Sequence, residues 1–155
     1  MLLWRTRQFE YQWLRTLAGR YEDFMETTQE ALSFSARSLR LDLTPEKRDR
    51  LMRPWLELTI WPDVAQATDA LKRSGLRLVL LSNMTTPMLE AGCRNAGLEG
   101  IFEHILSADR VHAHKPDSRA YQMAPDALGL GREEILFAAF AGWDTAGARW
   151  FGFPC

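Results

Sequence analysis

Three small polar clusters follow runs of apolar residues in this sequence, and they contain the side chains best suited to chemistry. They are Ser82-Asn83, Lys115-Pro116-Asp117 and Trp143-Asp144. A hydroxyl, an amide, an ammonium and a carboxylate that converge on one crevice would bind an anion and handle its protons.

Each cluster alone has a commoner explanation. Ser82-Asn83 after a strand is more often a helix cap, and Asp117 or Ser118 would cap the helix that follows the lysine. Asp144 alone would be a first-turn residue stabilised by the helix dipole. The interpretation as one site therefore depends on whether the chain brings the clusters together.

The apolar runs before the clusters predict buried strands of a parallel sheet. Leu76–Ser82 is largely apolar and lies between helical segments, as in a sheet covered on both faces. His104–Ser107 and Ile135–Phe140 are the second and third predicted strands, and they alternate with helices as in right-handed βαβ units. Ligands of such sheets bind at the carboxyl ends of the strands, where these clusters should meet.

The first part of the chain predicts helices only. One runs to about Ala18, a second spans about Glu22–Leu39, and Thr44-Pro45 is a cap and first-turn signal for a third. The sequence thus predicts a helical subdomain at 1–60 and a partial α/β core domain at 61–155.

Composition excludes several classes of function. The chain has 155 residues and a formal net charge of −1, so it has no field that would gather nucleic acid or an anionic membrane. No apolar run approaches the roughly 20 residues that span a bilayer. Two cysteines are too few for a disulfide framework, and a reducing, cytoplasmic setting is the default expectation.

The segments LLSN, HKPDSRAY and AGWDTAGARWFGFP resemble the haloacid dehalogenase superfamily. The opening LWRTRQFEYQWLR, with GRYEDF, resembles the helical cap of its L-2-haloacid dehalogenases (type II). This resemblance implies an α/β fold, a Rossmann-like parallel sheet with an inserted or N-terminal helical cap. It implies hydrolysis of (S)-2-haloacids to (R)-2-hydroxyacids through an aspartyl ester, with no cofactor and no metal. The expected partners are a 2-haloalkanoic acid, a halide ion and, in a homodimer, a second copy.

The resemblance also implies which residues bind substrate and halide. Arg5 would receive the departing halide, and Phe9 and Phe24 would be apolar walls of its pocket. Ser82 and Asn83 would bind the substrate carboxylate. Without the resemblance, Arg5 would be a solvated charge and the two phenylalanines would be core packing.

The remaining implied roles concern the ester. Lys115 would keep the nucleophile ionised, and Tyr121 would sit close behind it. Trp143 would pack on the substrate, and Asp144 would position or deprotonate the hydrolytic water. Covalent catalysis of this kind divides one difficult displacement into two easier steps. His114, which stands where the family often has Tyr, receives no role.

The family nucleophile is an aspartate in an Asp-x-Tyr-Gly-Thr motif on the central strand, and these 155 residues contain no such motif. We therefore expect a truncated fragment that lacks the central nucleophile strand and is inactive alone. Strands left beside that gap would expose unpaired edges, so poor solubility or partial unfolding is expected. Ala139 and Ala141 stand where many type II enzymes have Ser and Asn, which puts rate and substrate range in doubt.

Two alternatives remain open from the sequence. A superfamily phosphatase would need Mg²⁺ held by carboxylates, but residues 138–141 supply no acidic side chain before Asp144. A non-catalytic relic fragment would share the same sequence features without any activity.

Overall fold

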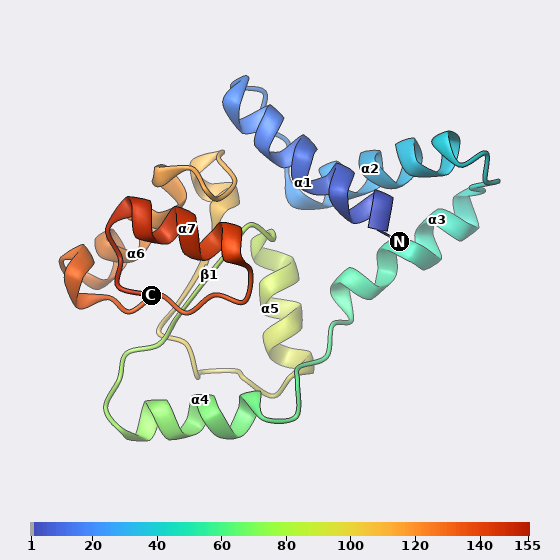
Figure 1. The fold of residues 1–155 in the computed structure, drawn as a ribbon. Helices are drawn as coiled ribbons and strands as arrows, with labels where there is room; N and C mark the ends of the chain where they lie inside the picture. The colour runs from blue at the N-terminus through green and yellow to red at the C-terminus, as the bar shows by residue number, and fades with distance from the viewer. Residues whose placement is uncertain (1) are drawn as a thin grey trace.

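The computed structural model describes residues 2–155, in which a helical N-terminal part precedes alternating helices and strands (Figure 1). The α-helices are α1 (Leu2–Leu17), α2 (Phe24–Ser38), α3 (Pro45–Met52), α4 (Val64–Arg73), α5 (Thr86–Asn95), α6 (Ser118–Leu128) and α7 (Gly142–Phe151). The strands are β1 (Val79–Ser82) and β2 (His104–Ser107). Short 3₁₀ helices are η1 (Arg53–Leu56), η2 (Ala108–Val111) and η3 (Arg132–Glu134).

The N-terminal helices begin where the sequence supplies caps. The Asp23 carboxylate accepts hydrogen bonds from the backbone N–H of Met25 at 2.7 Å and of Glu26 at 2.9 Å. Thr44 caps α3, whose first residue is Pro45. The three helices predicted for this part are therefore present. Whether residues 1–60 form a separate subdomain stays a prediction.

Helix α1 packs along α2 through a stripe of α2 side chains that are small or apolar. The buried members of this stripe are Phe24, Thr27, Thr28, Ala31, Leu32, Ser35 and Ala36. The Trp4 indole N–H donates to the Thr28 carbonyl at 2.8 Å, which fixes the relative positions of the two helices.

Strands β1 and β2 form a parallel pair in which Ser82 lies opposite Ser107. The predicted second strand has the observed bounds. The prediction for the first strand was too long, since pairing begins only at Val79. Gly75 closes α4 with φ +86°, a conformation that favours glycine.

The third predicted strand, Ile135–Phe140, is wrong for this structure. None of its residues is in a strand, because no neighbouring strand among residues 2–155 supplies the hydrogen bonds a ladder needs. The segment is nevertheless held in place. Phe137 N–H donates to the Pro154 carbonyl at 2.8 Å, and Ile135 and Phe137 pack on the core while Leu136 and Phe140 are exposed.

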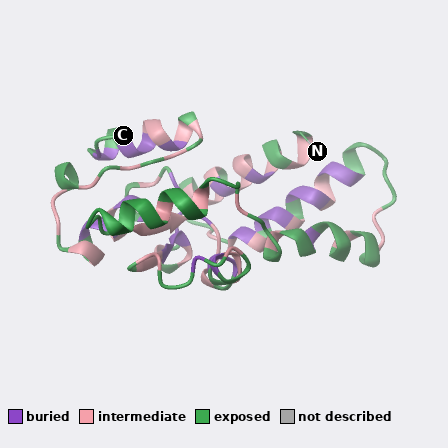
Figure 2. Ribbon diagram, turned by 90° about the horizontal axis from the view of Figure 1, so that it is seen from below, coloured by how far each residue is buried: buried purple, intermediate pink, exposed green. Residues whose placement is uncertain are grey.

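The α/β part has one apolar core, centred on the fully buried Tyr121. Its other buried members are Leu106, Ala124, Ala148, Phe151 and Phe153, contributed by β2, α6, α7 and the C-terminal residues. By contrast, α4 has no buried residue, and Figure 2 shows it mostly in the exposed colour. None of the helices described for residues 2–155 is long and apolar enough to cross a membrane.

Contacts of Tyr21 and Thr16 join the helical part to the loop before Lys115. The Tyr21 ring stacks on the ring of His112 and contacts the tilted ring of His114, with centroid distances of 5.2 and 4.9 Å. The Tyr21 hydroxyl donates to Asp109 at 2.9 Å. The backbone N–H of His114 donates to the Thr16 hydroxyl at 3.1 Å.

Candidate active site

The centre of the site is a buried ion pair between Lys115 and Asp144. Lys115 Nζ lies 2.6 Å from Asp144 Oδ2, and the two side chains are only 7% and 12% exposed. Nζ also donates to the Leu81 carbonyl at 3.2 Å, and the Tyr121 hydroxyl donates to Asp144 Oδ1 at 2.8 Å. Four elements therefore meet at this ion pair: the end of β1, the loop after η2, α6 and α7.

Burial and the hydrogen bond to Asp144 raise the pKa of Tyr121. The phenol thus keeps its proton and acts only as a donor to the carboxylate. Gly147 gives the ring room. A Cβ at Gly147 would meet the Tyr121 hydroxyl at 2.5 Å and Pro116 at 2.6 Å.

Asn83 fixes the backbone of Lys115 from the end of β1. Its Oδ1 accepts from the Lys115 backbone N–H at 2.7 Å, and its Nδ2 makes longer contacts to the Lys115 carbonyl (3.4 Å) and to Gln12 Oε1 (3.3 Å). The Ser82 hydroxyl accepts from the Met84 N–H at 3.2 Å, which is the local capping contact also expected for it. That contact leaves the Ser82 hydroxyl proton able to donate elsewhere.

Aromatic rings from α1 cover the start of α7. Trp143, next to Asp144, contacts Phe9 and Trp13 with centroid distances of 5.4 and 5.8 Å. The Arg5 guanidinium lies over Phe9 at 4.3 Å and over Trp55 at 5.5 Å. Desolvation lowers the pKa of Arg5, but an arginine remains charged at neutral pH.

The site thus combines a buried cation, a carboxylate held by two donors, and an apolar aromatic wall with an arginine at its edge. Such a set can bind a small carboxylic acid and activate water beside it. In residues 2–155, no three His, Cys, Asp or Glu side chains are grouped as a metal ion would require.

The family model for haloacid dehalogenase-like hydrolases matches residues 5–152. The chain belongs to the haloacid dehalogenase-like hydrolases. It is 45% identical to an (S)-2-haloacid dehalogenase of Pseudomonas sp. (strain YL), over 98% of this chain and 66% of that protein. It is 41% identical to haloacetate dehalogenase H-2 of Moraxella sp. (strain B), over 98% of this chain and 68% of that protein.

Solved structures of this family have the same fold as this chain. An L-2-haloacid dehalogenase from Xanthobacter autotrophicus superposes with a TM-score of 0.89 at 37% identity, over 97% of this chain and 61% of that one. A second structure of that enzyme has chloropropionic acid covalently bound. The chain therefore has the haloacid dehalogenase α/β fold and spans about two thirds of the length of these relatives.

Most residues singled out from the sequence lie together. Lys115, Asp144, Tyr121 and Asn83 share direct hydrogen bonds, and Ser82 adjoins them in the chain. Trp143 links this group to Phe9 and, through Phe9, to Arg5. Phe24 is buried farther along the helical part. It packs on Trp55, the second ring beneath Arg5, at a centroid distance of 5.2 Å.

Sequence reasoning missed Gln12 and Trp13. Gln12 is 1% exposed and contacts Asn83, and Trp13 contacts Trp143. The missed signal was spacing, because Gln12 follows Phe9 by three residues and so continues the same face of α1.

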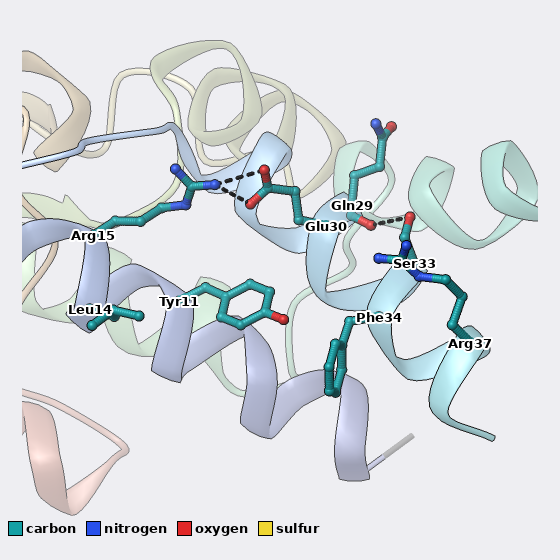
Figure 3. A pocket seen from close by; sticks show the side chains of 8 residues that line it. All are labelled: Tyr11, Leu14, Arg15, Gln29, Glu30, Ser33, Phe34 and Arg37. Carbon is teal, nitrogen blue, oxygen red and sulfur yellow. Dashed lines mark hydrogen bonds and ion pairs between the residues drawn. The ribbon is translucent and has the colours of Figure 1, made fainter.

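A separate groove of about 460 Å³ lies between α1 and α2 (Figure 3). Its lining includes Tyr11, Arg15, Gln29, Glu30 and Phe34, and Arg15 donates to both oxygens of Glu30 at 2.6–2.7 Å. It contains none of the residues described for the site.

Proposed function

We propose that this chain provides most of the active site of an enzyme that hydrolyses (S)-2-haloacids to (R)-2-hydroxyacids. The observation that carries the proposal is the buried cluster of Lys115, Asp144 and Tyr121, positioned beside an aromatic wall with an arginine. The relatives named above, an (S)-2-haloacid dehalogenase and a haloacetate dehalogenase, support this substrate class.

The reaction has two steps. An aspartate oxygen attacks C2 of the acid, the carbon–halogen bond breaks, and the halide leaves with the bonding electron pair. Water then adds to the carbonyl carbon of the aspartyl ester and loses a proton. The C–O bond between the aspartyl carbon and the substrate oxygen breaks, the departing oxygen takes the second proton of the water, and the 2-hydroxyacid and the aspartate carboxylate result.

Lys115 supplies a buried positive charge that favours an ionised nucleophile beside it. Asp144, held by Lys115 and Tyr121, accepts the proton of the water or orients it. Because Lys115 and Tyr121 already hold both oxygens of Asp144 in place, these groups do not have to rearrange when the water reacts.

Arg5, with Phe9, Phe24 and Trp143, forms the halide and alkyl pocket. A halide ion is weakly hydrated, so it loses little when it leaves water. The Arg5 guanidinium, which lies on aromatic rings, offers it a positive charge in an apolar setting. Ser82 and Asn83 bind the substrate carboxylate through the hydroxyl and amide protons. A homodimer and a cytoplasmic location stay predictions.

The attacking aspartate is not among these 155 residues in the family's motif, so the chain alone should release no halide. We expect activity when the chain is extended at its N-terminus with a segment carrying Asp-x-Tyr-Gly-Thr, taken from a curated relative. Chloride release from each enantiomer of 2-chloropropionate, with and without a chelator, measures it.

The proposal is supported if the extended chain, but not the 155-residue chain, releases chloride from the (S)-enantiomer and a chelator does not stop the release. Halide release by the 155-residue chain would refute the inference that it lacks the nucleophile. A folded extended chain that releases no halide, or consumes only the (R)-enantiomer, would refute the substrate assignment. Mg²⁺-dependent phosphate release would favour the phosphatase alternative.

A further inference from the structure

Two hydrogen-bond donors of α1 are buried at the site without an acceptor. They are Gln12 Nε2 and Trp13 Nε1, and no acceptor for either is found among residues 2–155. A buried donor left unpaired costs free energy, and native proteins rarely keep one without a purpose. Gln12 and Trp13 adjoin each other in the chain. Gln12 contacts Asn83, which binds the Lys115 backbone, and Trp13 contacts Trp143, which directly precedes Asp144.

Only one of the two polar groups of the Gln12 side chain has a hydrogen-bond partner among residues 2–155. Its Oε1 accepts from Asn83 Nδ2 at 3.3 Å, and this sets the orientation of the amide of Gln12 and leaves Nε2 free to donate. Asn83 Nδ2 itself has only the two long contacts, at 3.3 and 3.4 Å. Donors therefore outnumber good acceptors at this contact between α1 and the carboxyl end of β1.

We propose that Gln12 is a specificity residue whose Nε2 binds the carboxylate of the acid, beside Asn83. The proposal rests on the proposed function and adds to it a ligand contact from the helical part. A carboxylate is the ligand that matches, because it is acceptor-only and has two oxygens for the two amides. A neutral amide of the same size has only one acceptor oxygen and places an NH₂ group where the second oxygen would be, so one of the two side-chain amides would face a donor.

The proposal predicts that carboxylate binding depends on Gln12, and the hydroxyacid product allows binding to be measured without turnover. Ligand-observed NMR on the extended chain described above would titrate 2-hydroxypropionate and its neutral counterpart 2-hydroxypropionamide. The wild-type chain should prefer the carboxylate. Gln12→Glu keeps an oxygen for Asn83 but removes the donor and adds a like charge, so carboxylate binding should weaken by about tenfold to a hundredfold.

Gln12→Met controls for the added charge, since it removes the donor and keeps the length of the side chain. It should also weaken carboxylate binding. Gln29→Glu is the matched control for net charge, because Gln29 lies on α2 in the groove of Figure 3. It should bind like wild type. Thermal melts of all variants show whether a loss comes from unfolding.

Carboxylate binding that is the same in wild type and folded Gln12→Glu overturns the role of Gln12. No carboxylate preference in the folded wild-type chain overturns it as well. Neither result bears on halide release by the extended chain, so the proposed function can stand when this inference fails. Gln12-dependent binding without any halide release would leave the inference standing and refute the reaction.

Discussion

Replacing Lys115 with Met should cost the fold about 3–5 kcal/mol of unfolding free energy, the usual range for breaking a buried ion pair. The variant keeps the length of the side chain and loses three contacts of Nζ: Asp144 Oδ2 at 2.6 Å, the Leu81 carbonyl at 3.2 Å and the Phe137 ring at 5.4 Å. Asp144 is then left as a buried carboxylate, and the Tyr121 hydroxyl is its one remaining hydrogen-bond donor among residues 2–155.

A loss of this size should lower Tm by about 6–20 °C in a chain of this length. Urea unfolding, followed by circular dichroism at pH 7, would measure it. Lys47→Met is the matched control. Lys47 Nζ lies 2.7 Å from Asp42, but these side chains are 47% and 76% exposed, so the loss should stay below about 1 kcal/mol.

A double-mutant cycle tests the physical reason. Asp144→Asn alone leaves the Lys115 ammonium buried and unpaired, whereas the double variant removes both charges. The double variant should therefore be more stable than the sum of the single losses predicts. Additive losses, or a Lys115→Met effect no larger than that of Lys47→Met, would show that the pair is not a buried electrostatic unit.

Two further predictions concern aromatic residues near the site. Tyr121→Phe removes the 2.8 Å hydrogen bond to Asp144 and should cost about 1.5–3 kcal/mol in urea unfolding; an unchanged midpoint would contradict that bond. Burial lowers the pKa of His114 below its ordinary 6.5, so the unfolded chain binds the proton more readily. Stability from this residue is complete above pH 6.5 and falls below it by up to about 1.4 kcal/mol per pH unit. His114→Phe should remove that part of the slope between pH 7.5 and 5.5, and an identical slope would refute it.

The parts of the fold predicted well were those decided by local chemistry. Asp23 and Thr44 start their helices through hydrogen bonds to nearby backbone N–H groups, so a short window of sequence suffices. His104–Ser107 was predicted with its observed bounds because it is short, apolar and ended by a polar loop.

The features that were predicted wrongly or missed depend on contacts with residues distant in the sequence. Ile135–Phe140 has the composition of a buried strand, but a strand also needs a neighbour to bond with, and none is present among residues 2–155. Its side chains still alternate between the core and the exterior. Gln12 was missed for a related reason: a glutamine on a helix is ordinarily exposed, and only its contact with Asn83 shows what buries it.

The contacts of Tyr21 with the rings of His112 and His114 have a mechanical consequence. Together with the Thr16–His114 hydrogen bond, they clamp the turn between α1 and α2 to the residue directly before Lys115. The peptide link between the helical part and the rest is the stretch 57–63, which is neither helix nor strand. The contacts of Tyr21 and Thr16 with the residues just before Lys115 therefore join the helical part to the active-site loop at a place far in sequence from the connecting stretch, so a displacement of these helices would disturb the backbone next to Lys115.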